Sequence, residues 1–304
     1  MTAPSTQAAR GADVRAAAFA ALVLGAVAMG VSPVFVRLAE IGPFASAFWR
    51  VALSLPALLL WARLEAGSRE RPDAAARMAL LLAGLFFAGD LTFWHLAIMN
   101  TSVANATFLA TLAPVWVALG SGLVLSEAVG ARVLIGLALC LTGAAALIGG
   151  TWGYAPERLA GDLYGIVTSI FFGAYFLAMR RARRAYGSGR ALFLSTLVTA
   201  AILLVEAWAI ESRMWPAAYG AVAALVALAL VSHAGGQGLL AFALGHLPAA
   251  FSSLVIFLEA VAAALVGWMV LGEAVGPLQG LGALAIFAGI AVARPARRAA
   301  GGPR

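Results

Sequence analysis

The chain alternates between long apolar runs and short polar gaps. Each run is mostly Ala, Leu, Val, Ile, Gly and Phe, and each is long enough for a helix to cross a bilayer, which takes ~20 residues. No stretch alternates between apolar and polar residues with a period of two, so the pattern predicts helices and not a membrane barrel. The ten predicted spans cover residues 17–38, 43–63, 75–98, 101–124, 130–150, 162–181, 191–210, 217–243, 248–270 and 276–293.

The distribution of arginine over the gaps predicts the orientation of the spans. Cytoplasmic segments of membrane proteins are rich in Lys and Arg. With the N-terminus inside, sixteen of the twenty arginines fall in inner segments, whereas Arg37, Arg158 and Arg213 fall outside and Arg50 lies within the second span. We therefore expect a multi-pass protein with both termini in the cytoplasm. All twenty basic residues are Arg and none is Lys, which suggests a GC-rich bacterial genome and hence a bacterial inner membrane.

The composition is typical of a protein surrounded by lipid, and it limits the kinds of partner that we expect. Hydrophobic residues make up 63% of the chain and charged residues 11%, whereas soluble domains carry ~25% charged residues. The net charge of +7 would suit nucleic acid, but the arginines lie where they set topology, so we expect membrane lipid and a small-molecule substrate as partners and no nucleic acid. Cys140 is the single cysteine, and no Cys–His cluster has zinc-site spacing, so we expect no metal and no cofactor.

A repeated block divides the chain into two halves. LVLSEAVG at 123–130 and MVLGEAVG at 269–276 share Glu-Ala-Val-Gly, and an offset of 146 also aligns Gly136 with Gly282 and Gly143 with Gly289. Each half holds five spans, and because five is odd the second half crosses the membrane in the opposite sense. Secondary transporters are commonly built from such inverted repeats, with the substrate site between them near the midplane. The alternative is chance similarity between two apolar stretches. The shared Glu-Ala-Val-Gly block makes this alternative the weaker interpretation.

These features resemble the EamA repeats of the drug/metabolite transporter superfamily. The stretch GDLTFWHLAIMNTSVANATFLATLAPVWVAL at 89–119 is similar to the third and fourth helices of its ten-helix exporters. The resemblance covers about residues 17–293 and implies an all-α integral membrane protein of ten helices in two inverted five-helix repeats. The closest branch is that of YddG-type exporters, which carry aromatic and other hydrophobic amino acids outward. One departure concerns the ninth span, where many members have proline and this chain has Glu259 and Ala260 in LEAVAAAL.

The span pattern and the resemblance give the domain boundaries. The first apolar run is too long for a signal-peptide core, so we expect an uncleaved first span after a polar tail. We divide the chain into a cytoplasmic tail at 1–16, a first repeat at 17–150, an external linker at 151–161, a second repeat at 162–293 and a cytoplasmic tail at 294–304.

Polar residues inside spans are the candidates for a substrate site, because they are costly in lipid. Asp90 shares a helical face with Phe86, Trp94 and Ala97, and we interpret this face as a cavity wall where Asp90 attracts an ammonium group or carries a proton. The alternative is a structural Asp90 paired with His95, His233 or a hydroxyl group.

The sixth span carries a polar and aromatic stripe at helical spacing. The stripe has two tyrosines and a threonine where lipid would accept Leu or Val equally well, so we expect it to line the substrate path. An anchor at the membrane interface is the alternative for Tyr164. The stripe consists of Tyr164, Thr168, Phe172, Tyr175 and Met179.

Further polar positions lie in the eighth, ninth, fourth and first spans. VSHAGGQG at 231–238 brings His233 and Gln237 into mid-span, which predicts either an irregular helix that lines a cavity or tight helix packing with interhelical hydrogen bonds. Glu259, beyond Ser252 in the ninth span, should carry a proton or have a partner, and either a proton-carrying or a structural role fits it.

Asn105, Thr107 and Thr111 precede Pro114, and Ser32 precedes Pro33. We expect bending or gating at both prolines, with a fixed kink as the alternative.

Charged residues near the span ends are interpreted as structural. Arg50 could bind a substrate carboxylate, but snorkelling to headgroups or a pair with Glu40 is favoured. Glu127 and Glu273 each precede a new helix, where a carboxylate satisfies free N–H groups, and Glu127 could also pair with Arg132. The GxxxG spacing of Gly161 with Gly165 and of Gly276 with Gly280 favours close helix contacts; a homodimer is one way to form them, and a monomer suffices for transport.

Together these features predict a secondary exporter of small amphipathic metabolites, with aromatic and hydrophobic amino acids as the first choice. The sequence has no Gly-x-x-x-x-Gly-Lys motif, so we expect no direct use of ATP and no catalytic residues. A drug or nucleotide-sugar carrier on the same scaffold is the alternative. A membrane-embedded enzyme ranks lower, because neither Gly-x-Ser-x-Gly nor His-Glu-x-x-His is present.

Overall fold

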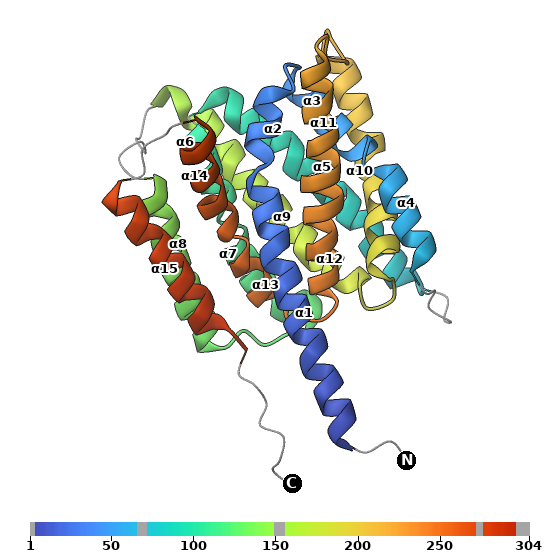
Figure 1. Cartoon of the computed structure of the whole chain (residues 1–304), viewed down its shortest axis with the longest axis vertical. Helices are drawn as coiled ribbons and strands as arrows, with labels where there is room; N and C mark the ends of the chain where they lie inside the picture. The colour runs from blue at the N-terminus through green and yellow to red at the C-terminus, as the bar shows by residue number, and fades with distance from the viewer. Residues whose placement is uncertain (1–3, 66–71, 102, 149–155, 272–275, 296–304) are drawn as a thin grey trace.

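The computed structural model describes residues 4–65, 72–101, 103–148, 156–271 and 276–295. Within these ranges every regular element is a helix, and the helices form one bundle (Figure 1). The start of α1 and the end of α15 lie at the same end of the bundle, as an even number of crossings requires.

The first half builds five rods from eight α-helices. Three rods are interrupted, and the break in each of the first, second and fourth rods lies two residues before a proline. The rods are α1 (Pro4–Gly30) with α2 (Ser32–Leu38), α3 (Pro43–Ala52) with α4 (Leu55–Leu64), α5 (Ala74–Asn100), α6 (Val103–Ala110) with α7 (Ala113–Gly120) and the π-helical turn at Ser121–Leu125, and α8 (Ala131–Ile148).

The second half repeats this plan with fewer interruptions. Its first two rods are continuous, whereas its third contains a long π-helical segment and its fourth is broken. A 3₁₀ turn at Pro156–Arg158 leads into α9 (Leu159–Ala182), followed by α10 (Ser188–Ile210), α11 (Tyr219–Ala227) with the π-helix Leu228–Gln237 and α12 (Gly238–Leu244), α13 (Ala249–Val255) with α14 (Leu258–Leu271), and α15 (Pro277–Ala293).

The helices match the predicted membrane spans. Among the described residues, eight rods are long and apolar enough to cross a membrane, and the shorter apolar helices Ala131–Leu147 and Pro277–Ala293 occupy the places of the fifth and tenth predicted spans. Large apolar side chains such as Leu64, Trp208 and Met269 are exposed on the outside of the bundle. A soluble protein rarely exposes so much apolar surface, but lipid favours it. The predicted all-α membrane fold is confirmed.

The contact between α8 and α15 shows the inverted relation of the two halves. Gly136 faces Gly289 and Gly143 faces Gly282, so the helices run antiparallel and exchange equivalent residues (Figure 1). A Cβ added at Gly136 would lie 2.5 Å from the Gly289 carbonyl oxygen, and one added at Gly289 would lie 2.6 Å from that of Gly136. Only glycine permits this approach, so the duplicated glycines allow the close packing of the two helices.

A second reciprocal contact joins the second and seventh rods. Glu65, after α4, accepts a 2.6 Å hydrogen bond from the backbone N–H of Ser188 at the start of α10. Glu211, after α10, accepts a 2.9 Å bond from the N–H of Phe44 at the start of α3. The two glutamates are 146 positions apart, and each satisfies free N–H groups at the N-terminus of the other rod. These reciprocal hydrogen bonds are also what two copies of one unit in opposite orientations would form.

The two GxxxG pairs differ in their surroundings. Gly161 packs against Asn100 and Thr101, and Gly165 packs against Leu109, so this pair makes close contacts inside the chain. A Cβ at Gly280 would have no neighbour within 4 Å among the described residues. The predicted close contact at Gly276–Gly280 is therefore not made within the described part of the chain, and a contact with a second copy stays a prediction.

Candidate functional site

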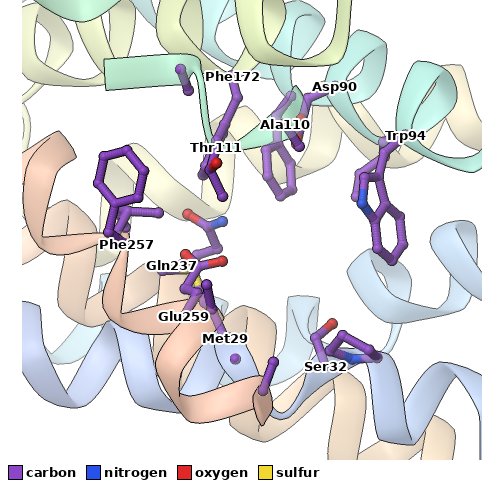
Figure 2. A pocket seen from close by; sticks show the side chains of 18 of the residues that line it. Met29, Ser32, Asp90, Trp94, Ala110, Thr111, Phe172, Gln237, Phe257 and Glu259 are labelled. Atoms are coloured by element: carbon purple, nitrogen blue, oxygen red, sulfur yellow. The ribbon is translucent and has the colours of Figure 1, made fainter. Parts of the chain in front are cut away.

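A partly open cavity lies where the broken rods of both halves meet. Its volume is about 140 Å³. Figure 2 shows Asp90 and Trp94 on one side of this cavity and Gln237, Phe257 and Glu259 on another. The walls are mostly apolar, with a few polar and ionisable groups among them. The lining residues are Met29, Gly30, Ser32, Pro33, Arg50, Phe87, Asp90, Leu91, Trp94, Ala110, Thr111, Ala113, Pro114, Phe172, Gln237, Ile256, Phe257, Glu259, Ala260 and Ala263.

The first rod is interrupted at the cavity, next to a proline. Helix α1 ends at Gly30, and α2 starts at Ser32 with Pro33 in its first turn. Proline has no N–H to donate to the preceding turn, so the carbonyl groups there lose their helical partners. The helix is interrupted beside Ser32 and Pro33, which line the cavity, and bending or gating there stays a prediction.

The fourth and ninth rods break at equivalent positions. The N–H of Thr111 bonds the carbonyl of Phe108 at 3.0 Å, and the N–H of Phe257, 146 positions later, bonds that of Leu254 at 3.1 Å. Both are bonds across three residues, which tighten and interrupt an α-helix. Pro114 explains the break between α6 and α7, but Ala260 takes its place beside the break between α13 and α14. The second repeat therefore keeps the interruption without the proline.

Arg50 lies in the cavity wall, which differs from the interpretation favoured by the sequence. Its side chain is 8% exposed, and its Nη1 donates a 3.2 Å hydrogen bond to the Ser32 hydroxyl group. No ion pair joins it to Glu40 in the described part of the chain, and burial leaves it no route to headgroups. It lines the same cavity as Asp90 and Glu259. The sequence analysis named Arg50 as able to bind a substrate carboxylate but favoured a structural role, although its place as the one arginine inside a span was a signal for the cavity.

Asp90 and Trp94 face the cavity from α5, one turn apart. The alternative pairing of Asp90 with a histidine is not seen among the described hydrogen bonds. His95 is buried behind the wall, with Nδ1 2.6 Å from the Leu91 carbonyl oxygen. His233 Nε2 lies 3.0 Å from the Thr196 hydroxyl oxygen. Neither histidine lines the cavity, whereas Asp90 does.

The predicted stripe of α9 reaches the cavity at one position. Phe172 lines the cavity, and Tyr175 lies one layer behind it, fully buried. Thr168 is also buried, and no hydrogen-bond partner contacts its hydroxyl group in the described structure. Tyr164 lies away from the cavity with its ring 6.1 Å from that of Phe93. A straight helix of 24 residues cannot turn its whole stripe toward one small cavity.

The π-helix of the eighth rod ends at the cavity. Gln237 is the last residue of the segment Leu228–Gln237, and its side chain points into the cavity (Figure 2). The Tyr175 hydroxyl group donates a 3.2 Å hydrogen bond to Gln237 Oε1, which holds the amide in place. The irregular helix predicted from VSHAGGQG is thus present, and tight packing is present as well, because Gly236 approaches Met29 and Gly25. Such π-helical turns occur often at functional sites.

The remaining candidate residues lie around the cavity or outside the described part of the chain. Thr111 and Pro114 line the cavity, whereas Ser252 does not line it and is buried with no hydrogen-bond partner among the described residues. The side chains of Asn105 and Thr107 in α6 lie outside the described part of the chain, and so does Glu273. Phe87, Phe257 and Met29 were not predicted, since isolated apolar residues in an apolar span give no signal.

Glu127 has a structural contact, but with other partners than those predicted. Its carboxylate lies 2.8 Å from Arg180 Nε and accepts a 2.9 Å hydrogen bond from the N–H of Ala249 at the start of α13. Arg180 also donates to the carbonyl oxygen of Leu244. Glu127 therefore caps the ninth rod and not the helix that follows it, and it pairs with Arg180 rather than Arg132. The chain folds back so that these segments meet, which local sequence does not reveal.

The fold and the cavity define the class. Broken helices from two inverted repeats meet at an internal cavity, which is the architecture of secondary transporters. The chain belongs to the EamA-like transporter family, whose family model matches residues 16–149 and again 159–294. The predicted superfamily is thereby confirmed.

Two further comparisons agree with this assignment. The chain is 27% identical over 277 residues to an uncharacterized transporter from Archaeoglobus fulgidus, a match that covers 90% of this chain and 95% of that relative. A solved crystal structure matches with a TM-score of 0.77 at 20% sequence identity, over 92% of this chain and 98% of its own, which shows a shared fold.

Proposed function

We propose that this membrane transporter exports small amphipathic metabolites, with aromatic and other hydrophobic amino acids as its substrates. The observation that carries the proposal is the cavity itself. Its walls combine apolar side chains, among them Trp94, Phe172 and Phe257, with the ionisable groups of Arg50, Asp90 and Glu259. An amino acid with an apolar side chain presents the same two kinds of surface.

The size of the cavity supports a small substrate. Pockets for drug-sized ligands measure roughly 300–1,000 Å³. A cavity of about 140 Å³ is smaller than that range. A drug or a nucleotide sugar would therefore require a much larger expansion of the cavity than an amino acid does.

Alternating access would proceed by movement of one repeat against the other around this cavity. Interrupted helices near the midplane are typical of transporters that work in this way. The breaks at Ser32, Thr111 and Phe257 all lie in the cavity wall, so a change of angle at any of them changes access to the substrate. We further propose the orientation with both termini in the cytoplasm of a bacterium, since it places most arginines inside.

Uptake into proteoliposomes tests the proposal. The purified protein is supplied with a panel of amino acids, lipophilic cationic dyes and nucleotide sugars, and empty liposomes serve as the control. Saturable uptake of hydrophobic amino acids alone is the expected result. Uptake of the dyes or the nucleotide sugars without amino acids would overturn it.

A further inference from the structure

The charged groups of the cavity have no counterparts in the opposite repeat. The offset of 146 places Arg50 on Thr196, Asp90 on Gly236 and Glu259 on Ala113. The contacts that build the fold are duplicated, as in the pairs Gly136–Gly289 and Glu65–Glu211. The first repeat thus folds without a charge at one of these places, and the second repeat folds without a charge at two of them. The three charges are costly in a membrane and are not required by the architecture, which points to a ligand.

Arg50 offers donors to an anion. Its Nη1 bonds Ser32, but no acceptor among the described residues contacts its buried Nε. A guanidinium group presents its N–H donors in a planar fork that matches a carboxylate. A buried donor without an acceptor is unfavourable, so a carboxylate that enters the cavity gains a partner and relieves this cost.

Glu259 offers an acceptor from the other repeat. It lies in the first turn of α14, next to the break at Phe257, and its Oε1 is buried with no donor from the described residues. Of the two cavity carboxylates, Glu259 is the one with a buried oxygen that no described donor contacts, so it is the group left to attract a cation.

We propose that the cavity holds its substrate as a zwitterion, with the substrate carboxylate on Arg50 and the substrate ammonium group on Glu259. The apolar side chain then packs against Trp94, Phe172 or Phe257. Because Arg50 and Glu259 belong to opposite repeats, a bound zwitterion links the two halves that move during transport. This assignment rests on the proposed transport of amino acids and adds the groups that select them. A lipophilic cation would use Glu259 without Arg50, and a simple anion would use Arg50 without Glu259.

Analogues of phenylalanine test the assignment in the wild-type protein. Phenylalanine amide lacks the carboxylate, and N-acetylphenylalanine lacks the ammonium group. Each should compete with phenylalanine uptake on the order of 100-fold more weakly than phenylalanine does, because a buried charged group would lose its partner.

Two variants then assign each end of the substrate. Arg50→Gln should raise the KM for phenylalanine and reduce the discrimination against phenylalanine amide, while discrimination against N-acetylphenylalanine remains. Glu259→Gln should show the opposite pattern. Arg37→Gln, which removes an exposed arginine of α2 outside the cavity, is the matched control and should behave as the wild type. Since each variant tests one end of the substrate, the assignment stays testable if the other variant does not fold.

The outcomes separate the two proposals. If the protein takes up phenylalanine but the amide and the N-acetyl analogue compete as well as phenylalanine, the zwitterion assignment is wrong and amino acid transport stands. The assignment is also wrong if neither variant changes the discrimination. If the wild-type protein takes up no amino acid, the proposed function fails together with the assignment.

Discussion

Arg50 and Glu259 face the same cavity from opposite repeats, Arg50 from α3 and Glu259 from α14. Their equivalents by the offset of 146 are the uncharged residues Thr196 and Ala113. Two kinds of residue can therefore be distinguished. The duplicated glycine and glutamate contacts hold the bundle together, whereas the charged groups of the cavity occur in one repeat only. Substitutions of the two kinds should have different effects, and matched controls within the chain separate them.

Tyr175→Phe should weaken substrate binding without loss of the fold. The change removes the hydroxyl group that bonds Gln237 Oε1 but keeps the ring, which packs against Phe87 and Phe172. We expect a higher KM with an unchanged amount of protein in the membrane, because a neutral hydrogen bond contributes about 1 kcal/mol. Uptake kinetics in proteoliposomes measure this. Tyr164→Phe, on the same helix but away from the cavity, is the control, and an equal rise in its KM would contradict the site.

Glu127→Gln should lower stability and leave transport kinetics unchanged. The carboxylate caps α13 through Ala249 and pairs with Arg180 at the end of α9, outside the cavity. Loss of a charged cap costs about 1 kcal/mol, so the thermal midpoint in detergent should fall by a few degrees. Arg180→Gln should destabilise to a similar extent, whereas Arg132→Gln should not. Loss of transport in a Glu127→Gln protein of normal stability would refute the structural role.

Gly289→Ala should separate α8 from α15. The added methyl group would lie 2.6 Å from the Gly136 carbonyl oxygen, and the helices must shift to admit it, at about 1–3 kcal/mol. Thermal unfolding followed by tryptophan fluorescence should show a lower midpoint. Gly280→Ala in the same helix meets no described atom within 4 Å, so its midpoint should stay within a degree or two or rise. Equal midpoints for the two variants would show that the glycine contact is not tight.

The sequence predicted the parts of the fold that follow from local chemistry. Span positions follow from apolar length, and the helix breaks beside Pro33 and Pro114 follow from the missing N–H of proline. The break at Phe257 has no such local cause. It appears in the structure at the place equivalent to Thr111, so the duplication preserves a geometry that the local sequence no longer encodes.

The cavity could be predicted only in part, because it is assembled from distant segments. Polar residues inside spans, such as Asp90, Gln237 and Glu259, were visible as exceptions to an apolar pattern. Arg50 was assigned to the membrane surface because sequence position does not show that its side chain is buried against Ser32. Tyr164 and Thr168 share a helical stripe with Phe172, but only tertiary packing decides which part of a stripe meets the cavity.

Protection of a cysteine in the cavity tests most directly whether substrate binds there. Cys140 is the only cysteine of the chain, so Cys140→Ala gives a background without thiols in which Thr111→Cys places one in the cavity wall. Tyr219→Cys, at an exposed position at the start of α11, provides the control thiol. We predict that phenylalanine slows maleimide labelling of the thiol at position 111 in a saturable manner and leaves labelling at position 219 unchanged. Equal labelling of position 111 with and without saturating phenylalanine, in a protein that transports phenylalanine, would contradict the account.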